Sequence, residues 1–202
     1  MGSNWESFDI FTAMYPNFIR HIKRYVSLTD DETSLLLQQI KPLTPKKKEF
    51  LLQEGQVCRY NYFVEQGCLR MFFVNDKGTE QIVQFALENW WIADYMSFGM
   101  QRPSNFSIQA VETSQIVGLA YSQQDELFKQ LPQLERYFRI MMQRAYAAAQ
   151  MRVKFFHDFT KEESYLHFIR MFPDFAQRIP QYMLASYLGI TPEYLSELRK
   201  KQ

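Results

Sequence analysis

The chain has 202 residues, of which 47% are hydrophobic and 16% aromatic, and its formal net charge is +1. It can therefore bury a core in one or two domains, and any nucleic-acid binding must come from a local patch rather than from overall charge. The longest apolar runs are far too short to span a membrane, and residues 1–11 lack the pattern of a secretory signal. Because the chain has only two cysteines, Cys58 and Cys68, we expect a cytoplasmic protein with reduced thiols.

Residues 15–40 have the character of a helix. Thr29 and Glu32 can form a capping box, in which each side chain bonds the other's backbone N–H. Leu35, Leu36 and Ile40 then fall on one face. Prolines at positions 42 and 45 end the segment.

From residue 49 to about residue 120 the pattern changes to short apolar segments separated by turns. The segments are FLLQ, CRYNYFVE, CLRMFFVN, TEQIVQFA, FSIQAVE and SQIVGLA. Their spacing of about ten residues is typical of a β-sandwich or barrel. The three histidines, His21, His157 and His167, all lie outside this region, which argues against a metal-dependent barrel enzyme.

We expect Ser122 to cap a short helix that runs through Gln130, and a much longer helix to begin after Pro132. Neither proline nor glycine interrupts residues 133–159, so the helix is about 40 Å long. An apolar row follows alternating four- and three-residue steps, with Arg152 as a break, through Leu134, Phe138, Met141, Ala145, Ala148 and Phe155. Such a row is typical of a seam between two subunits, although it could also pack on the chain's own barrel.

The stretch Leu184–Lys201 predicts two short helices with a tight corner. Gly189 suits the left-handed turn that ends a helix, and Thr191 followed by Pro192 suits the start of the next one. Ala185, Leu195 and Leu198 form the apolar faces. Two helices joined in this way have the helix-turn-helix shape, although an ordinary helical hairpin in a core would share the pattern.

The order of helix, short strands, long helix and helix-turn-helix resembles the Crp/Fnr family of bacterial transcription regulators, from about residue 25 to residue 201. WIADYMSFGMQRPSNFSIQAVE is similar to the family's ligand cassette, and PQYMLASYLGITPEYLSELRKK to its DNA-reading end. The resemblance implies an α+β fold, with an N-terminal antiparallel β-roll or jelly-roll barrel, a long dimerisation helix and a C-terminal helix-turn-helix. Many relatives have a C-terminal wing after this motif, and we expect none here because no residues are left to form it. We expect a sensor domain at residues 1–131, the dimerisation helix at 132–159 and the DNA-binding domain at 160–202.

The cassette departs from the cyclic-nucleotide-binding pattern that the resemblance implies. Where such members have a Gly-Glu pair, this chain has Ala93 and Asp94, and the slots for the phosphate-binding arginine and its neighbour fall on Ser104 and Asn105. Arg102 comes two residues too early. Since a buried phosphate needs a cation, we expect weak binding of cyclic AMP or none. Ala93, Asp94, Ser104 and Asn105 are the candidate effector pocket, which could instead be empty or filled by aromatic side chains.

The DNA-reading end also departs from the family. By position, the base-edge readers would be Pro192, Glu193, Ser196 and Glu197. Phosphate contacts are expected from Gln181, Tyr182 and Thr191 by hydrogen bonding, and from Arg199, Lys200 and Lys201 by charge. Pro192 offers no side-chain donor, and Glu197 would repel the DNA backbone.

Two functions follow from these features. The first is a homodimeric regulator that binds a near-palindromic operator in double-stranded DNA, with an unidentified small-molecule effector and RNA polymerase as further candidate partners. The alternative is a small-molecule-binding or protein-interaction module that has lost specific DNA reading. We expect no enzyme, because the sequence offers no nucleophile–base pair or phosphate loop. We also expect no metal and no cofactor, since an iron–sulfur cluster needs about four thiolates.

Overall fold

The computed structural model describes residues 15–201, so the expectation for residues 1–11 lies outside it. The chain divides into two units. The first takes in the chain up to Met71 together with Phe85–Ile140, and the second takes in Phe72–Gln84 and the chain from Met141 onward. The three-part division predicted from the sequence stays a prediction.

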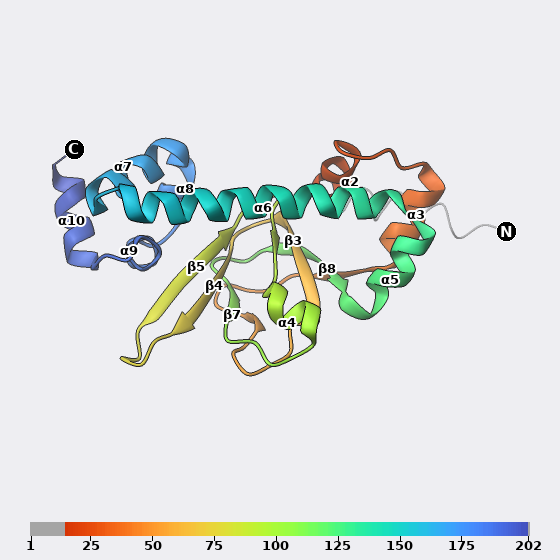
Figure 1. Cartoon of the computed structure of the whole chain (residues 1–202), viewed down its shortest axis with the longest axis horizontal. Helices are drawn as coiled ribbons and strands as arrows, with labels where there is room; N and C mark the ends of the chain where they lie inside the picture. Colours follow the sequence, from red (N-terminus) through yellow and green to blue (C-terminus); the bar gives the residue numbers. More distant parts are fainter. Residues whose placement is uncertain (1–14, 202) are drawn as a thin grey trace. The chain divides into compact units, whose positions relative to one another are not determined.

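Two four-stranded sheets build the β-roll (Figure 1). One sheet has the order β1 (Ile40–Leu43), β8 (Gln115–Ala120), β3 (Tyr60–Gln66) and β6 (Trp91–Ile92). The other has the order β2 (Phe50–Leu52), β7 (Ser107–Ala110), β4 (Leu69–Val74) and β5 (Glu80–Ala86). The pairs β1–β8, β3–β8, β3–β6 and β2–β7 are antiparallel, which confirms the predicted antiparallel β-roll.

Strand β3 is buried on both faces, and its two faces differ. Tyr62 and Val64 belong to the apolar cluster between the sheets, together with Leu69, Ile92, Ile108 and Ile116. Because side chains alternate along a strand, Phe63 and Glu65 lie on the other face. There the ring of Phe63 meets Phe18 edge-on at 5.3 Å between centroids. The buried Glu65 carboxylate accepts the backbone N–H groups of Asn17 and Phe18, both at 2.8 Å.

The N-terminal helical segment differs from its prediction. It consists of two helices, α2 (Pro16–Lys23) and α3 (Asp30–Gln38), because Thr29 caps the second helix in an extended conformation that a continuous helix could not hold. The predicted capping box of Thr29 and Glu32 is confirmed. Ile40 begins strand β1 rather than ending a helix. Pro42 is tolerated there because β1 is an edge strand.

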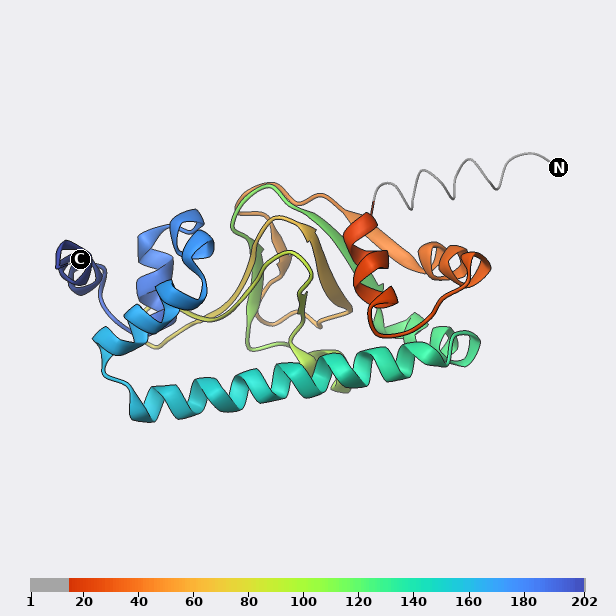
Figure 2. The same ribbon diagram turned by 90° about the horizontal axis from the view of Figure 1, so that it is seen from above.

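Three further helices follow, of which the first two belong to unit 1 and the third continues from unit 1 into unit 2. α4 (Tyr95–Met100) comes directly after β6, and α5 (Tyr121–Gln130) directly after β8. The cap of α5 is Ala120, without a side-chain bond, so the predicted cap at Ser122 is wrong. The long helix α6 (Gln133–Asp158) runs unbroken, within one residue of its prediction (Figure 2). No helix between residues 15 and 201 combines the length and apolar character needed to cross a membrane.

Unit 2 contains α7 (Lys161–Met171), α8 (Pro173–Arg178), α9 (Gln181–Leu188) and α10 (Pro192–Lys200), with the hairpin between β4 and β5. Ser186 on α9 joins this hairpin to the helices. Its hydroxyl donates to the Glu80 carbonyl at 2.7 Å and accepts the Ile82 N–H at 3.0 Å. The side chain thus satisfies backbone groups on β5, the edge strand of its sheet.

Candidate functional site

The predicted corner between two short helices is present between α9 and α10. Gly189 has φ +65°, in the left-handed region, and the Ile190 N–H reaches back to the Ala185 carbonyl at 3.0 Å. That six-residue return is the bond that closes a Schellman motif. Thr191 caps α10 by accepting the Tyr194 N–H at 3.2 Å. Both helix ends are therefore fixed by the residues that predicted them.

The small side chain of Ala185 on α9 lets the two helices pack closely. Ala185 and Leu195 are fully buried, and Leu184 and Leu198 nearly so. Since Leu195 and Leu198 face inward, the opposite side of α10 carries Glu193, Ser196, Glu197 and Lys200 at helical spacing. All four are exposed, as are Pro192, Arg199 and Lys201.

The three predicted phosphate-contacting residues that use hydrogen bonds differ in their placement. Tyr182 and Thr191 are exposed. Gln181 is half-buried, and its Nε2 donates to the Ala176 carbonyl at 3.5 Å. Its Oε1 is buried without a hydrogen-bond partner in the described chain. The Gln181 amide is therefore turned into the protein, and it would have to rotate to meet a phosphate.

The predicted apolar row on α6 lies largely against the chain itself. Leu134 and Phe138 are buried in unit 1, where Phe138 packs on Trp91 at 5.1 Å. The ring of Phe155 stacks on that of Phe159, with 4.7 Å between centroids. It lies tilted against the His167 ring, with 4.6 Å between centroids. Of the six predicted dimer positions, Ala145 and Ala148 are exposed and Met141 is half-buried.

A neighbouring row on α6 carries an exposed apolar stripe that sequence reasoning missed. The outer seam consists of Met142, Tyr146, Ala149, Val153 and Phe156. Its three largest exposed members, Tyr146, Val153 and Phe156, expose 67%, 59% and 72% of their surface. The sequence alone could have indicated the outer seam, because its residues keep the alternating four- and three-residue spacing without a charged residue. Arg152, which breaks the predicted row, instead donates to the Val83 carbonyl and lies over the Tyr187 ring at 4.3 Å.

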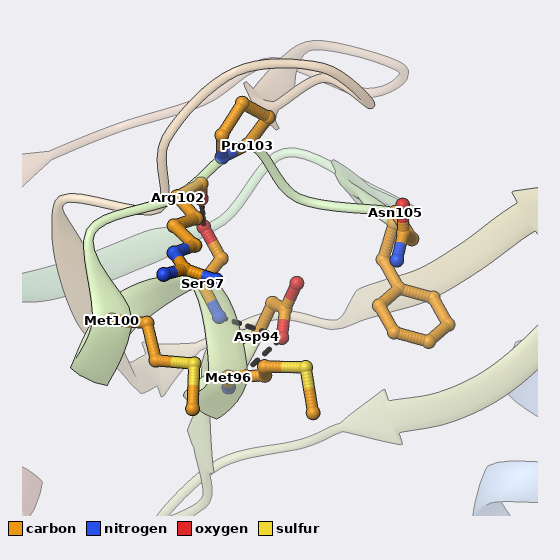
Figure 3. Close-up of a pocket in the computed structure, with 8 residues that line it drawn as sticks. Asp94, Met96, Ser97, Met100, Arg102, Pro103 and Asn105 are labelled. Atoms are coloured by element: carbon orange, nitrogen blue, oxygen red, sulfur yellow. Dashed lines mark hydrogen bonds between the residues drawn. The ribbon is translucent and has the colours of Figure 1, made fainter.

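The cassette forms a pocket of about 300 Å³ in unit 1. Asp94 and Asn105, two of the four predicted residues, line it, whereas Ala93 and Ser104 are buried behind its wall. Arg102, which comes two residues too early in the sequence to match the family's phosphate-binding arginine, is also a lining residue. Figure 3 shows Arg102 and Asn105 on opposite sides of the pocket, with Met96 and Met100 along α4.

Asp94 is already engaged within the protein. Its Oδ1 accepts the N–H groups of Met96 at 3.1 Å and Ser97 at 3.2 Å, and so caps α4. Its Oδ2 accepts the Ser104 hydroxyl at 2.6 Å. The hydrogen bond between Asp94 and Ser104 thus links the start of α4 to the loop that follows this helix.

Comparisons with known proteins agree with this arrangement. Residues 43–131 match the family described as Cyclic nucleotide-binding domain. Transcriptional activator protein Anr of Pseudomonas protegens is 35% identical over 121 residues, which cover 59% of this chain and 48% of the relative. Fumarate and nitrate reduction regulatory protein of Vibrio cholerae is 25% identical over 179 residues, covering 83% and 70%. The structure of FixK2 from Bradyrhizobium japonicum has the same fold, with a TM-score of 0.67, 17% identity, and coverage of 80% and 83%.

The chain is thus similar to regulators of the Crp/Fnr type. It spans about half the length of the first curated relatives that it matches, 48% in the case of Anr.

The polar groups of the cassette differ from the cyclic-nucleotide-binding pattern described under the sequence. The acidic residue that would take a ribose hydroxyl is Asp94, and its oxygens accept donors of the protein. The cation is Arg102 rather than a residue at position 104 or 105.

The two cysteines are buried in unit 1. Cys58 and Cys68 are buried and are not joined in a disulfide. Burial raises the pKa of the Cys58 thiol, which disfavours the reactive thiolate. Between residues 15 and 201, no three His, Cys, Asp or Glu side chains gather in a group that could hold a metal ion.

Proposed function

We propose that the protein is a homodimeric transcription regulator that binds double-stranded DNA through α10. The observation that carries this proposal is the outer side of α10, where every predicted reader is exposed while Leu195 and Leu198 hold the helix from behind. A helix anchored in this way can enter a major groove without disturbing the core. The names of the relatives, which are regulators and activators, support the same function.

Electrostatics make the expected DNA affinity modest. Residues 160–202 hold six cations against five anions. Three of those cations, Arg199, Lys200 and Lys201, sit together at the end of α10, all exposed. A dimer presents this basic end twice, which doubles the number of phosphate contacts and steepens the dependence of affinity on salt.

The outer seam of α6 is the proposed dimer interface. Its exposed apolar side chains follow the spacing at which two helices interlock, and the two alanine positions of the earlier prediction, Ala145 and Ala148, flank it. A symmetric pair would bury this stripe against its own copy. Leu134, Phe138 and Phe155 are left out of the interface, because their side chains pack on their own chain.

The test is a mobility-shift series with purified protein. Lys200→Glu should weaken binding to all sequences and lower the salt slope by about one phosphate contact per subunit. Glu193→Ala should change the preferred bases, since a glutamate at the head of the helix can accept a hydrogen bond from cytosine N4. Lys129→Glu, on α5 and outside unit 2, is the matched charge-reversal control and should leave binding unchanged. If neither variant of α10 differed from the control, α10 would not be the recognition helix.

A second candidate is supported by the acidic character of α10. Glu193 and Glu197 lie on its outer side, and Pro192 has no donor to offer a base. A protein-interaction or ligand-binding module that does not read DNA could carry this acidic surface without losing function. It predicts no sequence preference in the mobility-shift series, whereas the regulator predicts one.

The remaining partners follow from the proposed regulator. It would act in the cytoplasm, where bacterial DNA lies, and would meet RNA polymerase there. We propose no catalytic role, because the relatives are named as regulators. A small molecule that binds the cassette pocket would be the input signal.

A further inference from the structure

The pocket beside α4 retains few polar groups for a ligand. Besides Asp94, Ser97 is also engaged, since its hydroxyl donates to the Arg102 carbonyl at 2.5 Å and accepts the Cys58 N–H at 2.9 Å. The polar side chains left on the wall are the Arg102 guanidinium and the Asn105 amide, both exposed. Neither makes a hydrogen bond or ion pair with any residue that the structure describes.

The rest of the wall is apolar and adaptable. Met96 and Met100 expose 69% and 61% of their surface, and Pro103 and Phe106 complete the lining. Exposure of two thioether side chains beside a cavity is unfavourable in water unless something covers them. Methionine is flexible and polarizable, so the pair can adjust to an apolar chain of variable shape.

We propose that this pocket binds a small organic carboxylate with an extended apolar body. Arg102 holds the carboxylate through two N–H groups of its fork, and the Asn105 amide adds a donor from the other side. The apolar body lies along Met96 and Met100. This assignment rests on the proposed sensor role of the barrel, and it supplies the chemical class of the signal.

The same wall discriminates against other ligand classes. A cyclic nucleotide presents ribose hydroxyls that need acceptors, and both Asp94 oxygens already accept donors from the protein. A volume of about 300 Å³ lies at the small end of ligand pockets. A ligand with an ammonium group would need Asp94 to release the donors that cap α4. A simple carboxylate requires none of these changes.

The test uses methyl-¹³C methionine labelling of the full chain, without DNA. The chain has ten methionines, and Met96→Leu and Met100→Leu each remove one resonance and so assign it. Sodium octanoate should shift the Met96 and Met100 methyl signals saturably. Arg102→Gln should weaken this binding about tenfold or more, because it removes a charge-assisted pair. Arg59→Gln, an exposed arginine outside the pocket lining, should leave binding unchanged.

Three results would overturn the assignment. Octan-1-ol or cyclic AMP shifting the two methyl signals at the same concentration as octanoate would show that the carboxylate is not recognised. Equal binding by the Arg102→Gln variant would remove Arg102 from the site. Tighter binding of octylammonium, which has no carboxylate, than of octanoate would mean that Asp94 takes an ammonium group. Since DNA is absent, each of these failures is separate from a failure of the mobility-shift series.

Discussion

The hydroxyl of Tyr137 links the N-terminal helices, the barrel and α6 at a single buried point. The Trp91 Nε1–H, which can only donate, lies 2.8 Å from the Tyr137 oxygen, and His21 Nδ1 lies 2.7 Å from it. The Tyr137 oxygen thus accepts the Trp91 N–H, and its hydrogen bond with His21 runs in the direction set by the tautomer of the imidazole. His21, Trp91 and Tyr137 are all buried.

Removal of this hydroxyl should destabilise the fold. Tyr137→Phe leaves the buried Trp91 N–H without its acceptor, and the free energy of unfolding should fall by about 1–3 kcal/mol. Urea denaturation measures the change. Tyr194→Phe, at an exposed tyrosine on α10, is the control and should stay within about 0.5 kcal/mol of the parent. A similar stability for both variants would contradict the role of the network.

The buried phenol of Tyr137 should also make the folded protein less stable at high pH. Burial raises the pKa of Tyr137 above its ordinary value of 10.0, so the folded state keeps the neutral phenol where the unfolded chain ionises. The stability contributed by the neutral phenol is fully present below pH 10.0 and is lost as pH rises toward the raised pKa. Above pH 10, the parent should therefore lose stability faster than Tyr137→Phe. Parallel pH dependence of the two proteins would contradict this.

At the scale of elements, the corner between α9 and α10 depends on the backbone of Gly189. An added Cβ would find room, because its nearest neighbour is Lys161 Nζ at 3.6 Å. The cost of Gly189→Ala is therefore the left-handed backbone alone, about 1–2 kcal/mol. Gly99→Ala is the control, because Gly99 is helical and its Cβ would meet no atom within 4 Å. Hydrogen exchange of the α10 amides should accelerate in Gly189→Ala and not in the control; equal exchange would contradict this account.

Elements with local causes were predictable from the sequence, and elements with long-range causes were not. The capping box at Thr29 and the turn at Gly189 depend on residues within one turn of each other. Strand β1 forms because it pairs with β8, which is more than seventy residues away in the chain. The four residues IKPL alone do not indicate that partner. Asp94 and Asn105 line the cassette cavity, and so does Arg102, which was not among the four predicted residues; the effector pocket itself stays a prediction.

At the scale of the whole molecule, self-association should depend on the outer seam rather than on the row predicted from the sequence. Val153→Lys places a charge in the proposed interface twice, once from each subunit, and should raise the dimer dissociation constant about tenfold or more. Analytical ultracentrifugation measures it. Ala147→Lys, about 140° round the helix from Met142, is the control and should leave the dimer intact. An unchanged dimer in Val153→Lys would contradict the assignment.

The most direct test of the central claim is sequencing of the fragments that the purified protein retains from a random DNA pool. The account predicts an enriched two-fold-symmetric motif, with half-sites about one helical turn apart, that is lost in Lys200→Glu. Retained fragments without any common motif would contradict the claim that α10 reads DNA.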